Sequence, residues 1–212
     1  MPLEFRYFRA PEDEIGFLTG NRTCSLCGQS GRCFPLDGVN ISELSEEERR
    51  GKIGCFDCLR RDRFGFTHVT EVGLITEDGL LHFDELDDTP KRVFVVASDG
   101  EAIADSAPLV HPPKPHVSEE AVAELRRTPG FSTWQDVTWP VHCNDFMAYL
   151  GIWGPEDFDN ASPGAGRQLF LEMVDPFFHS RWTEDKGPRF GQNFVAFQCL
   201  HCQTRTATYD ID

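Results

Sequence analysis

The chain has 212 residues, of which 40% are hydrophobic, 12% aromatic and 26% charged, a composition typical of a globular protein with a sizeable core. No apolar run approaches the roughly 18 to 20 residues that a membrane-spanning helix needs. The N-terminus also lacks a basic stretch followed by an apolar one, so no secretory signal is expected. We therefore expect a cytoplasmic protein without a membrane partner.

The chain is strongly acidic, with 35 acidic and 20 basic residues and a formal net charge of −15. Such a field repels nucleic-acid phosphates and attracts basic surfaces. A basic protein partner is therefore favoured over nucleic acid, and a purely solubilising charge is the alternative. The densest acidic cluster is the predicted partner-binding site and consists of Asp84, Glu85, Asp87 and Asp88. Smaller acidic clusters at 12–14 and 46–48 are further candidates for this site.

The first predicted element is residues 3–8, whose alternating apolar and polar side chains favour an exposed edge strand. Two C-x-x-C pairs follow, Cys24/Cys27 and Cys55/Cys58. In a reducing compartment such pairs bind metal or do redox chemistry more often than they form disulfides. Four thiolates leave no open coordination position, so this pattern predicts a structural Zn²⁺ that stabilises the fold and does not catalyse.

Between these pairs, the sequence Ser-Glu-Glu-Glu at 45–48 is a capping box, which predicts a short helix that Gly51 ends. The apolar run at 93–96 suits a buried strand, and the proline-rich residues 108–116 suit a linker. Ser118 should cap a helix that ends before Pro129. Residues 154–166 are rich in glycine and proline and are expected to form a loop.

The last predicted element is a hairpin, formed by residues 194–199 and 205–211, with Cys199 and Cys202 at its tip. This pair has no second C-x-x-C, and Cys33 has no evident partner at all. A second Zn²⁺ is possible if Cys143 and either His142 or His201 complete the set, with Asp145 just behind. Of the two histidines, His142 is the predicted ligand. The alternative is a third pair of reduced thiols. His142 and Cys143 would point to opposite faces of a strand, which argues against a nucleophile and its base.

Together these elements predict an α+β fold, with zinc-ribbon-like knuckles, short β-sheets and a few short helices. We expect a β-rich region over 1–107 with a zinc-ribbon module at 20–62, the linker at 108–116, and a C-terminal α+β region over 117–212. The oligomeric state does not follow from the sequence.

The aromatic stretch at 127–135, the runs at 142–145 and 149–151, and the run at 197–202 resemble the bacterial CbrC family. Members usually carry a further cysteine where this chain has Met147, and small residues where it has Leu-Arg-Arg-Asp-Arg at 59–63. The family name is linked to tolerance of a DNase-type colicin. The resemblance therefore implies a role against a nuclease-type toxin, which agrees with the acidic charge.

The expected function is that of a non-enzymatic, zinc-stabilised protein that binds and neutralises a bacterial toxin. The alternative is a stress-related regulatory zinc protein that acts through an endogenous protein partner. Two further hypotheses have less support in the sequence. One is an enzyme that uses Cys143 or the C-terminal pair, and the other is nucleic-acid binding through Arg60, Arg61 and Arg63.

Overall fold

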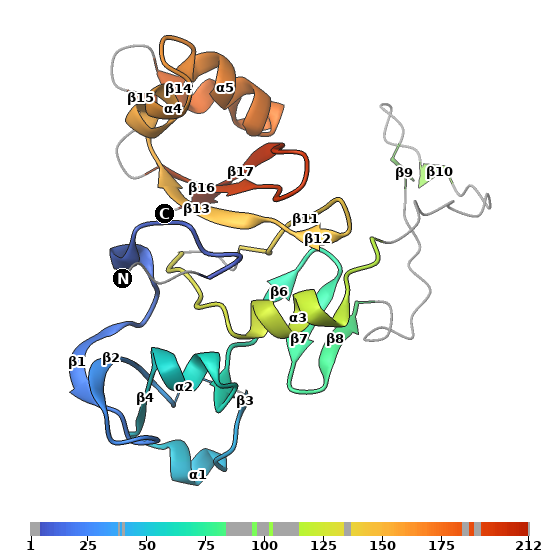
Figure 1. Cartoon of the computed structure of the whole chain (residues 1–212). Helices are drawn as coiled ribbons and strands as arrows, with labels where there is room; N and C mark the ends of the chain where they lie inside the picture. The colour runs from blue at the N-terminus through green and yellow to red at the C-terminus, as the bar shows by residue number, and fades with distance from the viewer. Residues whose placement is uncertain are drawn as a thin grey trace.

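The structure is a computed structural model that describes residues 5–37, 39, 41–83, 95–96, 102–103, 115–133, 137–183, 187–188 and 192–211. Helices and short antiparallel sheets are mixed within it, which confirms the expected α+β class. Figure 1 shows three groups of elements, one at each end of the molecule and one between them. Over the described ranges, no helix has the length and apolar character to cross a membrane.

The N-terminal group surrounds a three-stranded sheet of β1 (Thr19–Thr23), β2 (Ser30–Pro35) and β4 (Ile53–Cys55), in the order β1-β2-β4. A short 3-10 helix, η1 (Glu12–Glu14), precedes it, and β3 (Ile41–Ser42) pairs with β5 (Phe64–Gly65). The predicted capping box is confirmed at α1 (Glu46–Arg49), where Ser45 N–H donates to Glu48 at 3.0 Å. Helix α2 (Phe56–Arg60) starts directly after β4.

The middle group is the sheet of β6 (Val69–Thr70), β7 (Gly73–Thr76) and β8 (Gly79–His82), with α3 (Glu119–Arg126) beside it (Figure 1). The predicted cap of α3 is confirmed, because Ser118 Oγ accepts from the N–H of Ala121 at 3.2 Å. Strands β9 (Val95–Val96) and β10 (Ala102–Ile103), which lie between β8 and α3 in the chain, pair with each other.

The C-terminal group is built on the sheet of β13 (Ala148–Trp153), β16 (Gln192–Gln198) and β17 (Arg205–Ile211), in that order. The antiparallel pair β16–β17 confirms the predicted terminal hairpin. Helices α4 (Pro155–Ala161) and α5 (Gly166–Met173) lie over this sheet (Figure 1). The remaining elements are η2 (Pro176–Arg181), the hairpin of β11 (Val141–His142) and β12 (Asp145–Phe146), and the pair β14 (Trp182–Thr183) and β15 (Gly187–Pro188).

Two expectations about local structure were wrong. The predicted loop at 154–166 contains α4, because Pro155 occupies the first helical turn, where its missing N–H costs nothing, and Asp157 accepts from Gly154 N–H at 2.7 Å. The predicted exposed strand at 3–8 instead has Phe5, Tyr7 and Phe8 buried, and of its described residues only Arg6 is exposed. Its backbone bonds to β13, since Tyr149 N–H donates to Tyr7 O at 2.8 Å and Arg9 N–H to Tyr149 O at 2.9 Å.

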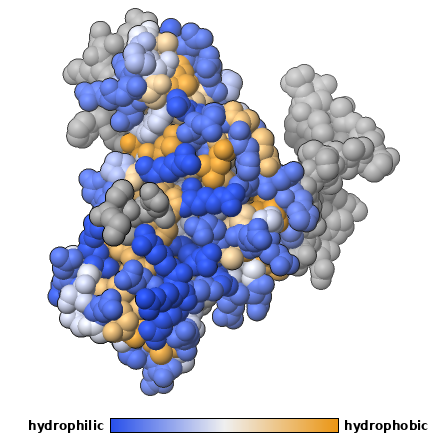
Figure 2. All heavy atoms as spheres, in the orientation of Figure 1, coloured by the Kyte–Doolittle hydropathy of each residue, from blue (hydrophilic) through white to orange (hydrophobic). Residues whose placement is uncertain are grey.

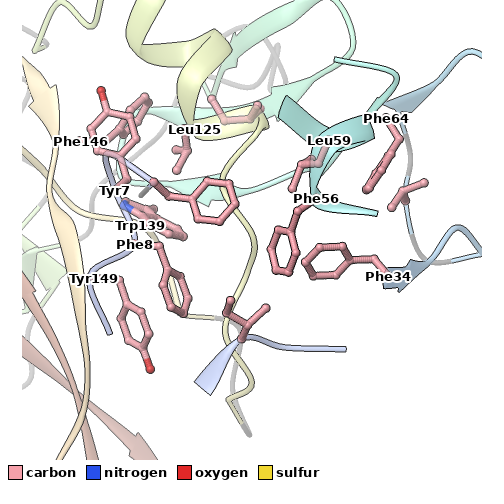
Figure 3. Close-up of a cluster of buried hydrophobic side chains, with 14 of the residues drawn as sticks. Tyr7, Phe8, Phe34, Phe56, Leu59, Phe64, Leu125, Trp139, Phe146 and Tyr149 are labelled. Carbon is pink, nitrogen blue, oxygen red and sulfur yellow. The ribbon is translucent and has the colours of Figure 1, made fainter. Parts of the chain in front are cut away.

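A chain of aromatic rings joins the N-terminal group to the C-terminal sheet. Phe34 on β2 packs edge-on against Phe66 at 5.2 Å, and Phe131 stacks on Tyr149 of β13 at 4.1 Å, with the Trp139 ring 5.3 Å from Phe131. Figure 3 shows rings of both groups within one buried cluster. This core draws residues from both sides of the predicted 108–116 linker, most of which lies outside the described residues.

A histidine lies inside this aromatic core. His68 is 8% exposed, its Nε2–H donates to the carbonyl of Thr128 at 3.0 Å, and its ring meets Trp139 edge-on at 5.1 Å. Burial lowers the pKa of His68 to about 4, and the hydrogen bond to Thr128 only partly opposes this shift. The folded chain therefore keeps His68 neutral at a pH where an unfolded chain would begin to protonate it.

This burial predicts a loss of stability in acid. Between the unfolded pKa, 6.5, and the folded pKa, about 4, the unfolded chain binds the extra proton, so unfolding becomes easier as the pH falls. Wild type should lose about 2 kcal/mol relative to His68→Gln between pH 7.5 and 5. Denaturant unfolding of both proteins at each pH measures this, and the comparison cancels acid effects common to both. Parallel stability curves would contradict the assignment.

Candidate metal centres

The structure brings Cys24, Cys27, Cys55 and Cys58 together, the four residues that the sequence selects for the first site. One Sγ atom from each lies within 4.8 Å of the others. Cys24 and Cys27 lie in the β1–β2 connection, Cys55 ends β4, and Cys58 lies in the first turn of α2. The pairing of Cys33 with Cys55 and of Phe34 with Gly54 aligns β4 with β2, which carries the second pair of cysteines towards the first.

The sulphur positions fit a tetrahedral ion. Cys24 Sγ lies 3.7 Å from Cys58 Sγ, and Cys27 Sγ lies 3.6 Å from Cys55 Sγ. Four sulphurs at a Zn–S distance of about 2.3 Å would be separated by about 3.8 Å along each edge of the tetrahedron. The first site is therefore already shaped to hold a metal ion of this kind.

Backbone N–H groups support the thiolate form that binds metal. Cys24 Sγ accepts from Leu26 N–H at 3.4 Å and from Cys55 N–H at 3.3 Å. Burial raises the pKa of Cys24, but these N–H groups outweigh it and lower the pKa to about 7. Burial and the neighbouring sulphurs raise the pKa of Cys58. Four ionised sulphurs this close thus call for a cation among them.

The second group consists of His142, Cys143, Cys199 and Cys202, whose ligand atoms also lie within 4.8 Å of one another. Cys199 and Cys202 lie in the β16–β17 connection, and the other two lie at the β11–β12 turn, which Figure 1 shows beside it. The structure places His142, the predicted histidine ligand, in the set, and the alternative His201 is not part of it.

The two C-x-x-C turns that connect paired strands, Cys24–Cys27 between β1 and β2 and Cys199–Cys202 between β16 and β17, fold the same way. Cys24 N–H donates to Gln29 O and Cys199 N–H to Thr204 O, each at 2.8 Å and each five residues along the chain. The residue after the second cysteine has a positive φ in both, 73° at Gly28 and 65° at Gln203. A non-glycine residue is uncommon in that conformation, so the sequence signal for the second turn was weaker than for the first.

The β11–β12 turn explains how neighbouring residues can both be ligands. Cys143 and Asn144 are its two central residues, with φ of 52° and 59°, as a two-residue hairpin turn of the right twist requires. The expectation that His142 and Cys143 point apart was wrong, because Cys143 lies in the turn and not on a strand. His142 Nδ1 lies 3.2 Å from Cys143 Sγ and 3.3 Å from Cys202 Sγ.

The two centres differ in exposure. Three of the four ligands in the first set are buried and only Cys27 is exposed, whereas in the second set Cys143 and Cys202 are both exposed and only Cys199 is buried. The hydroxyl and N–H of Thr204 lower the pKa of Cys202 to about 6. The second centre therefore contains a solvent-exposed cysteine, Cys202, whose side chain ionises more easily than a free thiol.

Asp145 ties the second centre to the N-terminal segment. Its buried carboxylate accepts from Tyr7 Oη at 2.5 Å, from His201 Nε2 at 2.8 Å and from the Arg6 guanidinium. Burial raises the pKa of Asp145, but these three donors outweigh it and lower the pKa. His201 thus positions the Cys199–Cys202 turn from outside the ligand set. No sequence spacing signalled the roles of Arg6 and Tyr7.

Two further sequence expectations can be placed. Met147, where a cysteine was expected by resemblance, is 3% exposed in the core, and its carbonyl accepts from Trp139 Nε1 at 2.7 Å. The second set has four donors without that position.

Cys33 is fully buried, and burial raises its pKa to about 11, as befits a thiol of the core. The predicted partner-binding cluster, Asp84, Glu85, Asp87 and Asp88, lies outside the described residues.

The Asp145 network predicts a clear mutational difference. Asp145→Asn leaves Tyr7 and Arg6 facing a neutral amide in a buried site, and we expect it to lower the free energy of unfolding by about 3 kcal/mol. Asp62→Asn is the matched control, because Asp62 pairs with Arg126 at a partly exposed position and should cost under about 1 kcal/mol. Denaturant unfolding measures both. Equal, small losses would show that the network contributes little.

Comparison with known proteins identifies a family. The model of the uncharacterised protein family UPF0167 matches residues 82–211, more than half of the chain. The UPF0167 protein PA1536 of Pseudomonas aeruginosa is 32% identical over 98 residues, which are 45% of this chain and 54% of that protein. The alignment thus spans about half the length of this curated relative. No solved structure matches the chain.

The matched stretch contains all four residues of the second centre, whereas the first centre lies before it. The family match also corrects the resemblance drawn from the sequence: neither the family model nor the curated relative points to CbrC. The link to a DNase-type colicin rested on that resemblance alone and has no support from this family. The chain belongs to the uncharacterised protein family UPF0167.

Proposed function

We propose that the chain is a non-enzymatic, zinc-stabilised protein that binds a basic protein partner. The observation that carries the proposal is the pair of four-donor sets, Cys₄ and HisCys₃, each assembled from segments far apart in the sequence. A partner-binding role is inferred from the charge of the chain.

Zinc is the ion that best suits these donors. Thiolate and imidazole ligands in tetrahedral arrangements select Zn²⁺, whereas Mg²⁺ and Ca²⁺ take oxygen ligands. When bound, Zn²⁺ neutralises the thiolates and crosslinks the segments that carry them. In the first centre Cys24 and Cys27 would fix the β1–β2 connection to the end of β4, and in the second centre His142 and Cys143 would fix one hairpin to another.

Closed ligand sets support a structural role. A catalytic zinc site keeps one position for water or substrate, with three protein ligands, whereas each set here supplies four. His201, a possible proton carrier near the second centre, is engaged with Asp145. These features favour metal centres that hold a binding surface in place over centres that perform chemistry.

The charge of the chain favours a basic partner, and it is unevenly distributed. Residues 19–65, around the first centre, hold eight basic and seven acidic residues, so the whole acidic surplus of the chain lies outside them. On the face shown in Figure 2, hydrophilic residues predominate, with smaller hydrophobic patches between them. An acidic surface speeds encounter with a basic protein and disfavours acidic competitors.

Two kinds of basic partner fit this proposal. A nuclease-type toxin is basic because it must grip phosphates, so neutralisation of such a toxin stays within the proposal on the charge argument alone. An endogenous basic protein, with a regulatory role for the chain, fits the same charge. Nucleic acid has less support, because Arg63 donates to Leu26 O and Glu43, and Arg60 lies over the Phe5 ring.

Partner capture tests the proposal directly. The tagged chain, used as bait in an extract of its own host, should retain one basic protein in near-equal amount at about 50 mM salt and lose most of it at about 300 mM, where charges are screened more strongly. In binding measurements with the purified partner, Glu85→Lys with Asp87→Lys should weaken affinity at least about tenfold. Glu46→Lys with Glu47→Lys, which changes the net charge equally on exposed α1, should not.

The outcomes separate the alternatives. A captured nuclease that the chain inhibits supports neutralisation, and a captured basic protein without toxicity supports the regulatory role. Capture of acidic proteins, or binding that neither salt nor the 85/87 variant weakens, would overturn the proposal of a basic partner at this cluster.

A further inference from the structure

A cavity of about 620 Å³ lies apart from both metal centres. Its walls come from four segments: residues 16–17, residues 34–35 of β2, residues 66–69, and positions 130 to 139 on either side of the undescribed residues 134–136. None of the eight metal-ligand candidates lines it. Its size is in the range of small-molecule sites, which is roughly 300 to 1,000 Å³.

Aromatic side chains dominate the cavity. Phe34 and Trp139 are buried and form its deep side, whereas Phe66 and Phe131 are partly exposed. Figure 3 shows Phe34 and Trp139 in the core cluster from which this wall is built. These rings already pack edge-to-face, as with Phe34 and Phe66 at 5.2 Å. A planar aromatic guest could extend the same pattern of contacts.

Exposed hydrophobic side chains mark the mouth of the cavity. Phe17 is 80% exposed and Val69 is 39% exposed, two of only four large hydrophobic residues so exposed in the described part of the chain. Phe17 also has a φ of 59°, a conformation that bulky side chains rarely adopt. The hydrogen bond from Gly16 N–H to Gly130 O, at 2.9 Å, holds this segment beside position 130 in the cavity wall.

The described lining residues of the cavity offer no charge to a ligand. None of them is an acidic residue, a lysine or an arginine. Among these described residues the one titratable group is His68, which donates to Thr128 O and is kept neutral by burial, as described above. A charged molecule entering this site would lose hydration without gaining a counter-charge.

We propose that this cavity binds an uncharged aromatic small molecule of about two fused rings. The volume accommodates such a molecule, and the aromatic walls and the uncharged character of the described lining residues select this class. This inference is independent of the metal centres and of the basic partner, since it uses none of their residues.

The test uses indole as the probe, because it is uncharged and has two fused rings. Isothermal titration of the metal-loaded chain should give a dissociation constant below about 1 mM. Indole-3-carboxylate, which adds one negative charge, should bind at least about tenfold more weakly. Failure of indole to bind at several millimolar, or equal binding of the carboxylate, would overturn the proposal.

A matched pair of glycine variants locates the binding. A Cβ at Gly130, in the cavity wall, would meet no heavy atom within 4 Å, so Gly130→Leu should fill space without moving the backbone. Gly20→Leu is the control, because a Cβ there is equally unobstructed and Gly20 lies outside the cavity. Indole affinity should fall at least about tenfold in the first and stay unchanged in the second.

If the leucine of Gly130→Leu turned to solvent, it would leave the cavity open. A second variant that fills the cavity from another position covers this case. Val69→Trp should weaken indole binding as well, and thermal unfolding of each variant checks that the fold is retained. Indole binding that survives both fillings would place the ligand elsewhere and overturn the proposal.

Discussion

The convergence of four potential metal ligands at each of two points is the constraint on which the rest of this structure depends. At both metal centres, ligand atoms converge to within 4.8 Å of one another. Like charges at such distances repel strongly unless a cation lies between them. The segments around them are short strands and turns with few residues to hold them together. If all four sulphurs of the first centre were ionised, a bound metal ion would turn their repulsion into a crosslink and would supply folding energy to elements that are otherwise marginal.

The two centres are connected to one core in different ways. The first is joined through Phe34 of β2, which starts the chain of aromatic rings that reaches Tyr149. The second is joined through Asp145, whose buried carboxylate holds Tyr7 and Arg6 of the N-terminal segment. The ends of the chain are therefore linked both by packing and by a charged hydrogen-bond network. This arrangement favours a rigid scaffold, which suits the proposed role of presenting a binding surface.

Much of this could be predicted from local sequence signals. Fixed spacing identified Cys24, Cys27, Cys55 and Cys58, and cap chemistry at Ser45 and Ser118 located two helices, because both signals act within a few residues. The burial of Phe5, Tyr7 and Phe8 could not be predicted, since it depends on pairing with a strand more than 130 residues away. His142 was the predicted ligand, but its convergence with Cys143 depends on the positive φ of Cys143, and the position of His201 outside the set depends on its contact with Asp145. Neither of these leaves a pattern in the sequence.

Metal content of the purified chain tests the central claim most directly. Elemental analysis of protein prepared without chelators should find two equivalents of zinc per chain. Cys24→Ser and Cys202→Ser should each remove one equivalent, whereas Cys33→Ala, at a buried cysteine outside both sets, should remove none. A folded chain that holds no zinc, or a loss of metal in Cys33→Ala equal to that in the two ligand variants, would contradict the account.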